Sequence, residues 1–373
     1  MQQTVEGWLI YELTGSPLYL SLIALARMGP LLLLSPIAGV IADRVDRTRI
    51  IMLAQLATAT VVFSTAVLIL VGSLEPWHLL VAAAISGIMT SLHVPARQAL
   101  IASLVGKNLI MSAVTLHSFA LNTTRIIGPQ IAGVLLSFVG PGACYIGQGC
   151  AYLWASQNLR RIKVRPPMTS LNNPGVWDNI QDGIKYVAKS PQLRGVVIVG
   201  SIGTMLVMPY LQFLPALVKD VYQTGPSGLA ILLGAAGVGG LLGSLLTASL
   251  GNMRRKGYLL FAGSFLGAIS LIGLSLSSSL LLSTIIQVLA GIGTGISMVA
   301  VGALMQILAS DEYRGRIGSL QIVLWGLGPV GALPMGLLAE TLGVPLVIGL
   351  AGAIATILLL LTLIMQPTIR QIE

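Results

Sequence analysis

Long apolar runs recur along almost the entire chain, and each is about as long as one crossing of a membrane. A helix needs about 20 apolar residues to cross the hydrocarbon layer, where the backbone must satisfy its own hydrogen bonds. Breaks rich in glycine and proline separate the runs, for example Gly15-Ser16-Pro17 and Gly140-Pro141-Gly142. We predict eleven complete crossings: residues 17–41, 50–72, 77–101, 110–138, 141–159, 195–218, 226–250, 257–276, 279–309, 317–340 and 343–365.

Lysine and arginine are concentrated in alternate breaks between these runs. Of the 21 basic residues, 17 fall in one set of breaks, whereas the opposite set holds only Lys219. The positive-inside rule makes the first set cytoplasmic, together with the long segment 160–194 and the C-terminus. Residues 1–14 are too short to span and must then be the outer end of an earlier crossing. We therefore expect twelve helices, with the first one truncated at Met1.

The two halves of the chain resemble each other. Residues 99–116 align with 303–320 at an offset of 204, and Gly128-Pro129 matches Gly328-Pro329. Two six-helix halves joined by a cytoplasmic segment are typical of rocking transporters built from parallel repeats. The sequence thus predicts an all-α polytopic membrane protein with two six-helix bundles. The expected domains are an N-terminal bundle over 1–160, a linker over 161–194 and a C-terminal bundle over 195–373.

The linker contains a helical pattern of its own. Trp177, Ile180, Ile184 and Val187 recur at helical spacing, with polar residues between them. This pattern predicts an amphipathic helix. Such a helix either lies in the cytoplasmic surface of the membrane or simply connects the two bundles.

Composition agrees with a membrane protein and excludes several other classes. Hydrophobic residues make up 55% and charged residues 9% of the chain, and the mean hydropathy is +0.90. A soluble domain carries roughly 25% charged residues. The net charge of +9 lies in short loops and not in a basic stretch interleaved with aromatics, so we expect no nucleic-acid partner. The sequence has no Walker A motif and no metal-ligand spacing, so we expect no enzyme activity, no cofactor and no metal.

The break at residues 39–49 carries a motif at the cytoplasmic end of a crossing. Gly39 allows close backbone approach, and Asp43 precedes Arg44 and Arg47 at a helix end. Such a cluster can pair with a neighbouring helix in one conformation and release it in another, as a conformational gate does. The chain here resembles the major facilitator superfamily, whose loop between helices two and three carries G-x-x-x-D-R-x-G-R-[RK]. Asp46 stands where that pattern has glycine.

A proline-containing motif lies in the fifth crossing. Pro129 removes a backbone donor, and Gly128 and Gly133 allow bending and close packing. The motif resembles the antiporter signature G-x-x-x-G-P-x-x-G-G of proton-coupled exporters in this superfamily. The match is partial, because Ala132 replaces one glycine and Thr124 another. The residues form either a structural kink or an exporter-type hinge.

Residues 7–17 and 95–100 narrow the resemblance. They are similar to the enterobactin-exporter and macrolide-efflux branch of drug–proton antiporters, and the similarity covers essentially the whole chain. The resemblance implies export of a bulky amphipathic small molecule, such as a drug, a siderophore or another metabolite. It further implies proton antiport by rocker-switch alternating access in the cell membrane.

Charged residues inside the predicted crossings are candidates for the transport site, because each costs roughly 2.5–3.5 kcal/mol or more when unpaired. Glu6 lies nine residues before Gly15, and Arg27 lies twelve after it. Both are therefore about 14–18 Å from the shared outer turn. We expect them to be neighbours, either as a proton-coupling pair or as a static ion pair.

Three further candidates are basic. Arg125 lies near mid-membrane and either attracts an anionic substrate or binds carbonyl groups near Gly128. His93 and Arg97 lie four residues apart on one helix and either relay protons or are merely satisfied within the bundle.

Two other classes of function compete with proton-coupled export. An uptake or facilitative carrier would share the fold, and only the partial motif at Gly128-Pro129 disfavours it. A non-transporting receptor or membrane enzyme would need a soluble domain or clustered catalytic groups, which the sequence lacks. We expect a monomer whose partners are a small-molecule substrate, protons and the lipid bilayer.

Overall fold

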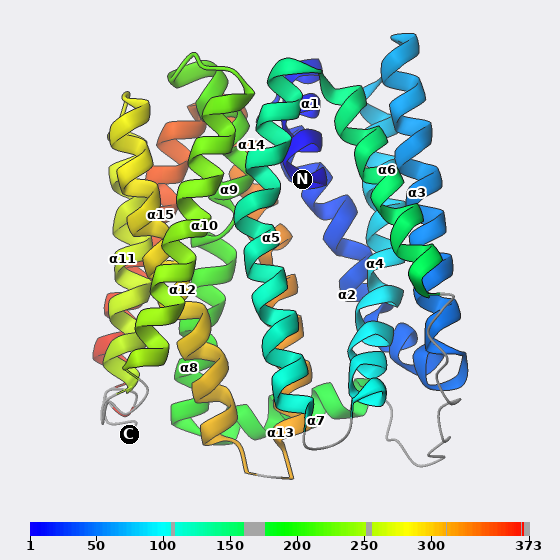
Figure 1. Ribbon diagram of the computed structural model, residues 1–373. Coiled ribbons are helices and arrows are strands. Elements are labelled where there is room, and N and C mark those ends of the chain that lie inside the picture. The colour runs from blue at the N-terminus through cyan, green and yellow to red at the C-terminus, as the bar shows by residue number, and fades with distance from the viewer. Residues whose placement is uncertain (106–108, 160–175, 251–255, 311, 367, 369–373) are drawn as a thin grey trace. The chain divides into compact units, whose positions relative to one another are not determined.

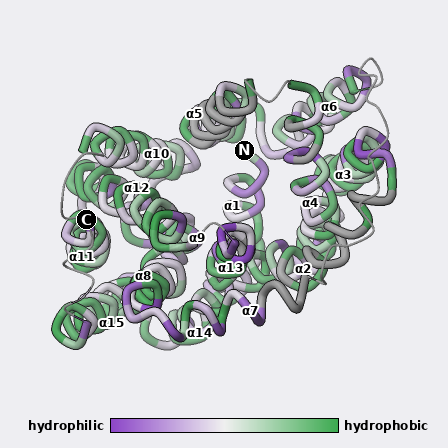
Figure 2. The backbone as a smooth tube through the Cα atoms, turned by 90° about the horizontal axis from the view of Figure 1, so that it is seen from below, coloured by the Kyte–Doolittle hydropathy of each residue, from purple (hydrophilic) through white to green (hydrophobic). Residues whose placement is uncertain are grey.

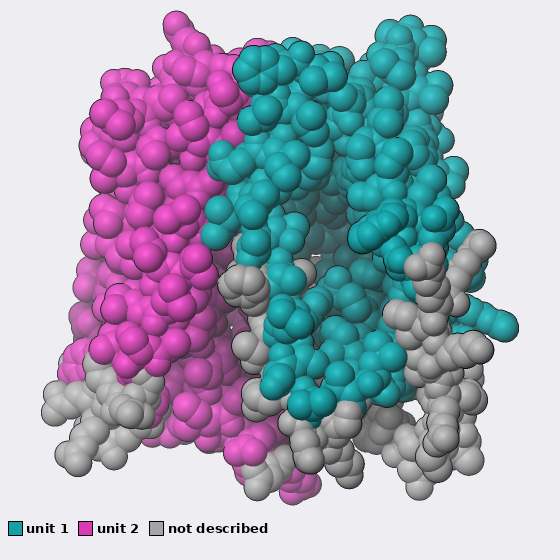
Figure 3. Space-filling view, in the orientation of Figure 1, with its two compact units in different colours: residues 1–15, 22–173 teal, residues 16–21, 174–373 magenta. Residues whose placement is uncertain are grey.

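The computed structural model describes residues 1–373 except 106–108, 160–175, 251–255, 311, 367 and 369–373. The described residues are mainly helical and contain no strand. They divide into two compact units, which are coloured separately in Figure 3. Unit 1 consists of residues 1–15 and 22–173, and unit 2 consists of residues 16–21 and 174–373. The sequence-based boundaries at residues 160 and 194 stay a prediction.

Unit 1 contains the helices of the first half of the chain (Figure 1). Its helices are α1 (Gln2–Thr14), most of α2 (Pro17–Arg44), α3 (Arg47–Val71), α4 (Pro76–Leu104), α5 (Ile110–Phe138) and α6 (Pro141–Leu159). Helix α3 packs along both α4 and α6. Gly15 and Gly72 end α1 and α3 with positive φ angles of 62° and 73°. A glycine adopts this left-handed conformation without a steric cost, so the chain turns sharply at both points.

Unit 2 contains the helices of the second half. They are α7 (Val176–Lys189), α8 (Pro191–Ile202), α9 (Tyr210–Ala216), α10 (Pro226–Ser249), α11 (Lys256–Leu276), α12 (Leu280–Leu308), α13 (Arg314–Gly326), α14 (Gly328–Leu342) and α15 (Val344–Met365). Helix α12 packs against α10 and α11. A Cβ atom added at Gly239 or Gly243 of α10 would collide with backbone carbonyls of α12. These glycines therefore pack two helices together, as small residues do in membranes.

Two predicted crossings are interrupted in the structure. The segment 195–218 is not one regular α-helix, because π-helical turns η2 (Gly203–Val207) and η3 (Leu217–Val221) border α9. Pro209 lies two residues after η2 and has no backbone N–H to donate. In a regular α-helix its ring would clash with the carbonyl group four residues earlier, and the wider π-helical turn avoids this clash. The segment 317–340 is likewise divided at Leu327, because Pro329 cannot donate the hydrogen bond that would continue α13.

The surface of these helices requires an apolar environment. Within the described residues, eight helical stretches are long and apolar enough to cross a membrane, and Pro17–Leu31 and Ile126–Phe138 are shorter apolar helices. Figure 2 shows hydrophobic residues along most of the helical tube. Large apolar side chains such as Phe138 (84% exposed) and Leu276 (82% exposed) point outward. Exposure on this scale destabilises a protein in water and is normal in lipid, so the chain is a multi-span membrane protein.

Helix α7, predicted as an amphipathic helix, packs within unit 2. Figure 1 shows it lying crosswise at one end of α8 and α13, and it contacts both. Val187 is buried, whereas Ile184 is 52% exposed; the side chains of Trp177 and Ile180 lie outside the described residues. The contacts therefore anchor α7 to unit 2 through part of its apolar face and leave Ile184 uncovered.

Candidate functional site

The most buried charges described in unit 1 form an ion pair between α1 and α2. The Glu6 side chain has no exposed surface, and its carboxylate pairs with the guanidinium of Arg27, whose side chain is 15% exposed. Each charge lowers the large cost of placing the other in an apolar interior. The structure thus brings together the two residues that the sequence places at similar depth.

A hydrogen-bonded network extends from this pair to two further helices. Gln2 Nε2 donates to Glu6 Oε1 at 2.7 Å and lies 3.3 Å from Ser86 Oγ of α4. Gln148 Nε2 of α6 donates to Gln2 Oε1 at 2.7 Å. Four helices therefore meet at one polar cluster inside an apolar bundle. The Glu6 carboxylate has hydrogen-bond donors on both sides and is connected to neighbouring polar groups through Gln2.

Two further residues, Gly87 and Tyr145, lie near Arg27. A Cβ atom on Gly87 of α4 would collide with the backbone carbonyl of Arg27, so glycine permits α2 and α4 to approach closely here. Tyr145 of α6 lies close enough for the charge of Arg27 to act on it. Among the described residues, the buried Tyr145 hydroxyl has no hydrogen-bond partner. This hydroxyl is therefore a buried polar group without a described partner in the vicinity of Arg27.

His93 and Arg97 form a separate basic cluster. Both lie on α4 and are partly buried, and His93 lies within electrostatic range of Arg97 and of His117 on α5. Within the described part of the chain, no hydrogen bond or ion pair joins this cluster to Glu6 or Arg27. The structure therefore separates these candidates from the buried ion pair.

The remaining candidates can be placed only in part. Helix α5 is continuous through Pro129, and both Gly128 and Gly133 are buried. Whether this segment acts as a hinge stays a prediction. Arg125 lies on α5, and its side chain lies outside the described residues.

The gate candidates lie where α2 ends and α3 begins. Gly39, Asp43 and Arg44 are in the last turns of α2, and Arg47 is the first residue of α3. The side chains of Asp43 and Arg44 and the burial of Gly39 lie outside the described residues. Asp46 accepts a hydrogen bond from the backbone N–H of Thr48 at 2.9 Å and so caps α3. This cap gives the residue that departs from the superfamily pattern a structural role, because N-terminal backbone donors need such an acceptor.

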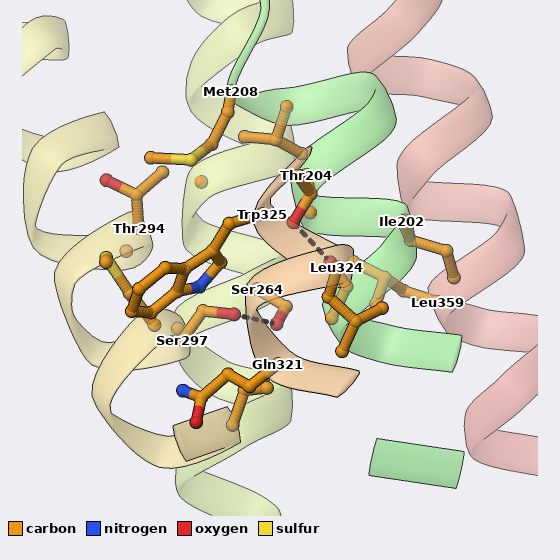
Figure 4. A pocket seen from close by; sticks show the side chains of 18 residues that line it. Ile202, Thr204, Met208, Ser264, Thr294, Ser297, Gln321, Leu324, Trp325 and Leu359 are labelled. Atoms are coloured by element: carbon orange, nitrogen blue, oxygen red, sulfur yellow. Dashed lines mark hydrogen bonds between the residues drawn. The ribbon is translucent and has the colours of Figure 1, made fainter. Parts of the chain in front are cut away.

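Unit 2 contains a pocket between α8, η2, α11, α12, α13 and α15 (Figure 4). Its cavity volume is about 50 Å³, within about 650 Å³ of space that is free of protein atoms and includes open solvent. Glycines, aliphatic side chains and two methionines line most of it. Its polar lining comes from Thr204, Ser264, Thr294, Ser297 and Gln321, with the indole of Trp325. Among the described residues that line it, none has an acidic or a basic side chain.

Sequence reasoning missed the neutral members of both sites. Gln2, Ser86 and Gln148 were not singled out, although a glutamine within a crossing is itself unusual and could have marked Gln148. Trp325 and Gln321 were missed because nothing in the order of residues shows which helices enclose a pocket. Uncharged polar residues can be recognised as parts of a site here only when tertiary packing shows that they lie together.

Comparison with known proteins agrees with this architecture. The family described as "Transmembrane secretion effector" matches residues 1–373. The multidrug efflux pump Tap of Mycolicibacterium fortuitum is 27% identical over 98% of this chain and 91% of its own length. The staphyloferrin A transporter of Staphylococcus aureus is 24% identical, over 91% of this chain and 85% of its own.

Two further comparisons concern another exporter and the fold. The enterobactin exporter EntS of Shigella boydii is 27% identical over 76% of this chain and 68% of its own. A bacterial homologue of the human lysosomal transporter Spinster, solved in an inward-facing and occupied conformation, has a TM-score of 0.74 at 15% identity. The match covers 99% of this chain and 93% of that one. The chain therefore belongs to the transmembrane secretion effector family of the major facilitator superfamily, and it is a membrane transporter and not an enzyme.

Proposed function

We propose that this protein exports a bulky amphipathic small molecule in exchange for protons. The observation that carries the proposal is the fully buried Glu6 carboxylate, paired with Arg27 and hydrogen-bonded to Gln2. A carboxylate is the side chain in this cluster that can take up and release a proton without losing its place in the network. Arg27 remains protonated under all physiological conditions.

The coupling step follows from the charges of the pair. When Glu6 binds a proton, its carboxyl group becomes neutral and its attraction for the Arg27 guanidinium weakens. Arg27 is then a buried cation without its counter-ion, a state that costs several kcal/mol unless the surroundings rearrange. Protonation would in this way favour a different arrangement of α1 and α2. Release of the proton to the other side of the membrane would restore the pair.

The proton gradient supplies enough free energy for export. One charge moved through 100 mV is worth about 2.3 kcal/mol, which corresponds to roughly a 50-fold concentration ratio of a neutral substrate. The relatives carry names that refer to multidrug, macrolide, staphyloferrin A and enterobactin transport. These names support bulky compounds with both polar and apolar parts as the substrate class. We further propose a monomer in the cell membrane, with the linker and the C-terminus on the cytoplasmic side.

The proposal is tested by transport in proteoliposomes under an imposed pH gradient. A panel of erythromycin, tetracycline, ethidium and iron-free enterobactin covers neutral, zwitterionic, cationic and siderophore chemistry. We expect at least one compound to move against its concentration gradient into the more acidic compartment. This accumulation should stop when a protonophore collapses the pH gradient. Movement of the compound only down its own gradient, unaffected by pH, would identify a facilitative carrier instead.

A matched pair of variants assigns the coupling to Glu6. Glu6→Gln keeps the hydrogen-bonding shape but cannot bind or release a proton. Glu12→Gln makes the same change on the same helix at an exposed position. We expect Glu6→Gln to abolish gradient-driven accumulation and Glu12→Gln to retain it. Equal accumulation in both variants would remove Glu6 from the coupling site.

A further inference from the structure

We infer that the pocket of unit 2 binds the uncharged, ring-bearing part of a small molecule that carries an oxygen acceptor. The pocket lies among helices of unit 2 alone, and it shares no residue with the Glu6–Arg27 network. That this molecule is a transport substrate rests on the proposed function. Binding itself is independent of any proton gradient.

The lining selects against charge. The 18 residues around the pocket include neither an acidic nor a basic side chain. An ionised group entering it would lose water without gaining a counter-ion, which is a large cost. Met208 and Met298 are flexible apolar side chains that adapt to ligands of different shape. An apolar, adaptable wall of this kind suits a ring system and not a charged group.

Two polar groups in the pocket are available for a ligand. Among the described residues, the Trp325 indole N–H and the Gln321 amide have no hydrogen-bond partner. Figure 4 shows both side chains extending from α13 toward Ser297. The indole is a donor only, and the Gln321 amide supplies two further N–H donors. A carbonyl, sulfonyl or ether oxygen is the group that both can bind.

The hydroxyl groups of the pocket are already occupied. Ser264 and Ser297 lie 2.9 Å apart and are hydrogen-bonded to each other. Thr204 donates to the backbone carbonyl of Gly200 at 2.9 Å, and Thr294 donates to that of Ala290 at 3.0 Å. The protons of these hydroxyl groups are already donated, so the donors left for a ligand oxygen are those of Gln321 and Trp325.

The backbone leaves space on the side of η2. A Cβ atom on Gly203, the first residue of this π-helical turn, would have no heavy atom within 4 Å. Such turns are often found at functional sites. A large side chain at this position would therefore extend into free space at the pocket wall without first colliding with a neighbour, and would reduce the room for a ligand.

Two fluorescent probes with the same ring system and different charge test the inference. Dansylamide is neutral and carries two sulfonyl oxygens, whereas dansylglycine carries the same ring system with a carboxylate. The purified transporter in lipid nanodiscs is titrated with each probe, without a pH gradient, and empty nanodiscs give the partitioning background. We expect saturable binding of dansylamide at least about tenfold tighter than that of dansylglycine, with energy transfer from tryptophan.

Variants locate the bound probe. We expect Gly203→Leu, Gln321→Leu and Trp325→Phe each to weaken dansylamide binding severalfold, with unchanged elution on gel filtration. Gly147→Leu is the matched control, because Gly147 of α6 is exposed, has no atom within 4 Å of an added Cβ and lies outside the pocket. Because three different changes are used, loss of folding in one of them leaves the test decisive.

Three results would overturn the inference. The first is equal affinity for the two probes. The second is equal binding by Gly203→Leu and Gly147→Leu. The third is displacement of dansylamide by lysophosphatidylcholine combined with no effect of Gln321→Leu and Trp325→Phe, which would identify a lipid chain as the occupant. A failure of proton-coupled transport would leave this binding result unchanged, so the two proposals fail separately.

Discussion

Glu6 and Arg27 occupy a position in which either charge alone would be costly. Glu6 is fully buried, and a hydrogen bond from Gln2 supplements its pairing with Arg27. Counting residues from the turn at Gly15 was enough to place the two at similar depth. The same counting could not place Ser86 or Gln148, because their helices are not joined to α1 by a short turn. Their approach depends on the packing of α1 against α4 and α6.

The buried pair predicts strong non-additivity between its members. Arg27→Gln alone leaves Glu6 buried without its counter-ion, and we expect it to lower the free energy of unfolding by about 3–5 kcal/mol. The double variant Glu6→Gln with Arg27→Gln has no buried charge at this position and should recover most of that loss. Thermal unfolding of the detergent-solubilised protein measures both. Additive losses in the double variant would show that the two side chains do not stabilise each other.

Gly87 gives a prediction about close packing beside this pair. An added Cβ would collide with the backbone of Arg27, so Gly87→Ala must push α2 and α4 apart. We expect a destabilisation of about 1–3 kcal/mol, although alanine favours a helix more than glycine does. Gly147→Ala, with no atom within 4 Å of its Cβ, should be neutral or slightly stabilising. A melting temperature equal to wild type for Gly87→Ala would contradict the close approach of these helices.

The sequence predicts where several helices begin and end, but not where a helix is interrupted. The predicted segment 110–138 coincides with α5, and 141–159 coincides with α6, because apolar length and glycine–proline breaks are local properties. The division of 317–340 at Leu327 and the π-helical turns around α9 were not predicted. Proline residues within those segments were visible, yet α4 and α5 contain Pro95 and Pro129 and remain continuous. Whether a proline divides a helix therefore depends on the neighbouring helices.

Helix α7 is held to α13 and the turn before it by specific contacts. Tyr186 stacks on Tyr313 with ring centroids 4.2 Å apart, and Arg316 lies over the Tyr313 ring at 4.7 Å. Arg316 also pairs with Asp182 at 3.7 Å. The Ser310 backbone N–H donates to the Tyr186 oxygen at 3.2 Å, and hydrogen bonding to Ser310 holds the pKa of Tyr186 below its ordinary value. These contacts explain why the amphipathic helix is docked on unit 2.

Limited trypsin digestion measures the strength of this docking, because Lys185 and Lys189 are exposed on α7. Tyr313→Ala removes the stacked ring and the cation–π contact, together worth about 1–2 kcal/mol. Cleavage at the two lysines, followed by mass spectrometry, should therefore become roughly five- to thirtyfold faster. Asp182→Asn removes two partly exposed ion pairs, one with Arg316 and one with Lys185, so its rate should rise less than about fivefold. Equal rates in wild type and Tyr313→Ala would show that the aromatic stack does not hold α7.

At the scale of the whole molecule, the fold class and the superfamily were predictable from the sequence. Apolar runs and a low content of charged residues identify a polytopic membrane protein, and the motifs around Asp43 and Pro129 indicate the family, which the match over residues 1–373 confirms. The pocket of unit 2 was not predictable, because helical segments far apart in the sequence, from α8 to α15, contribute to it. Substrate identity is similarly a property of shape and solvation and not of any local motif.

The central claim is that proton movement and substrate movement are coupled through Glu6. The most direct measurement uses proteoliposomes with a trapped pH-sensitive dye and no initial pH gradient, to which a gradient of a transported panel compound is applied. We expect the substrate gradient to drive protons in the opposite direction in wild type and in Glu12→Gln, and we expect Glu6→Gln to move no protons. A pH change of equal size in Glu6→Gln, or substrate movement in wild type with no pH change, would contradict the claim.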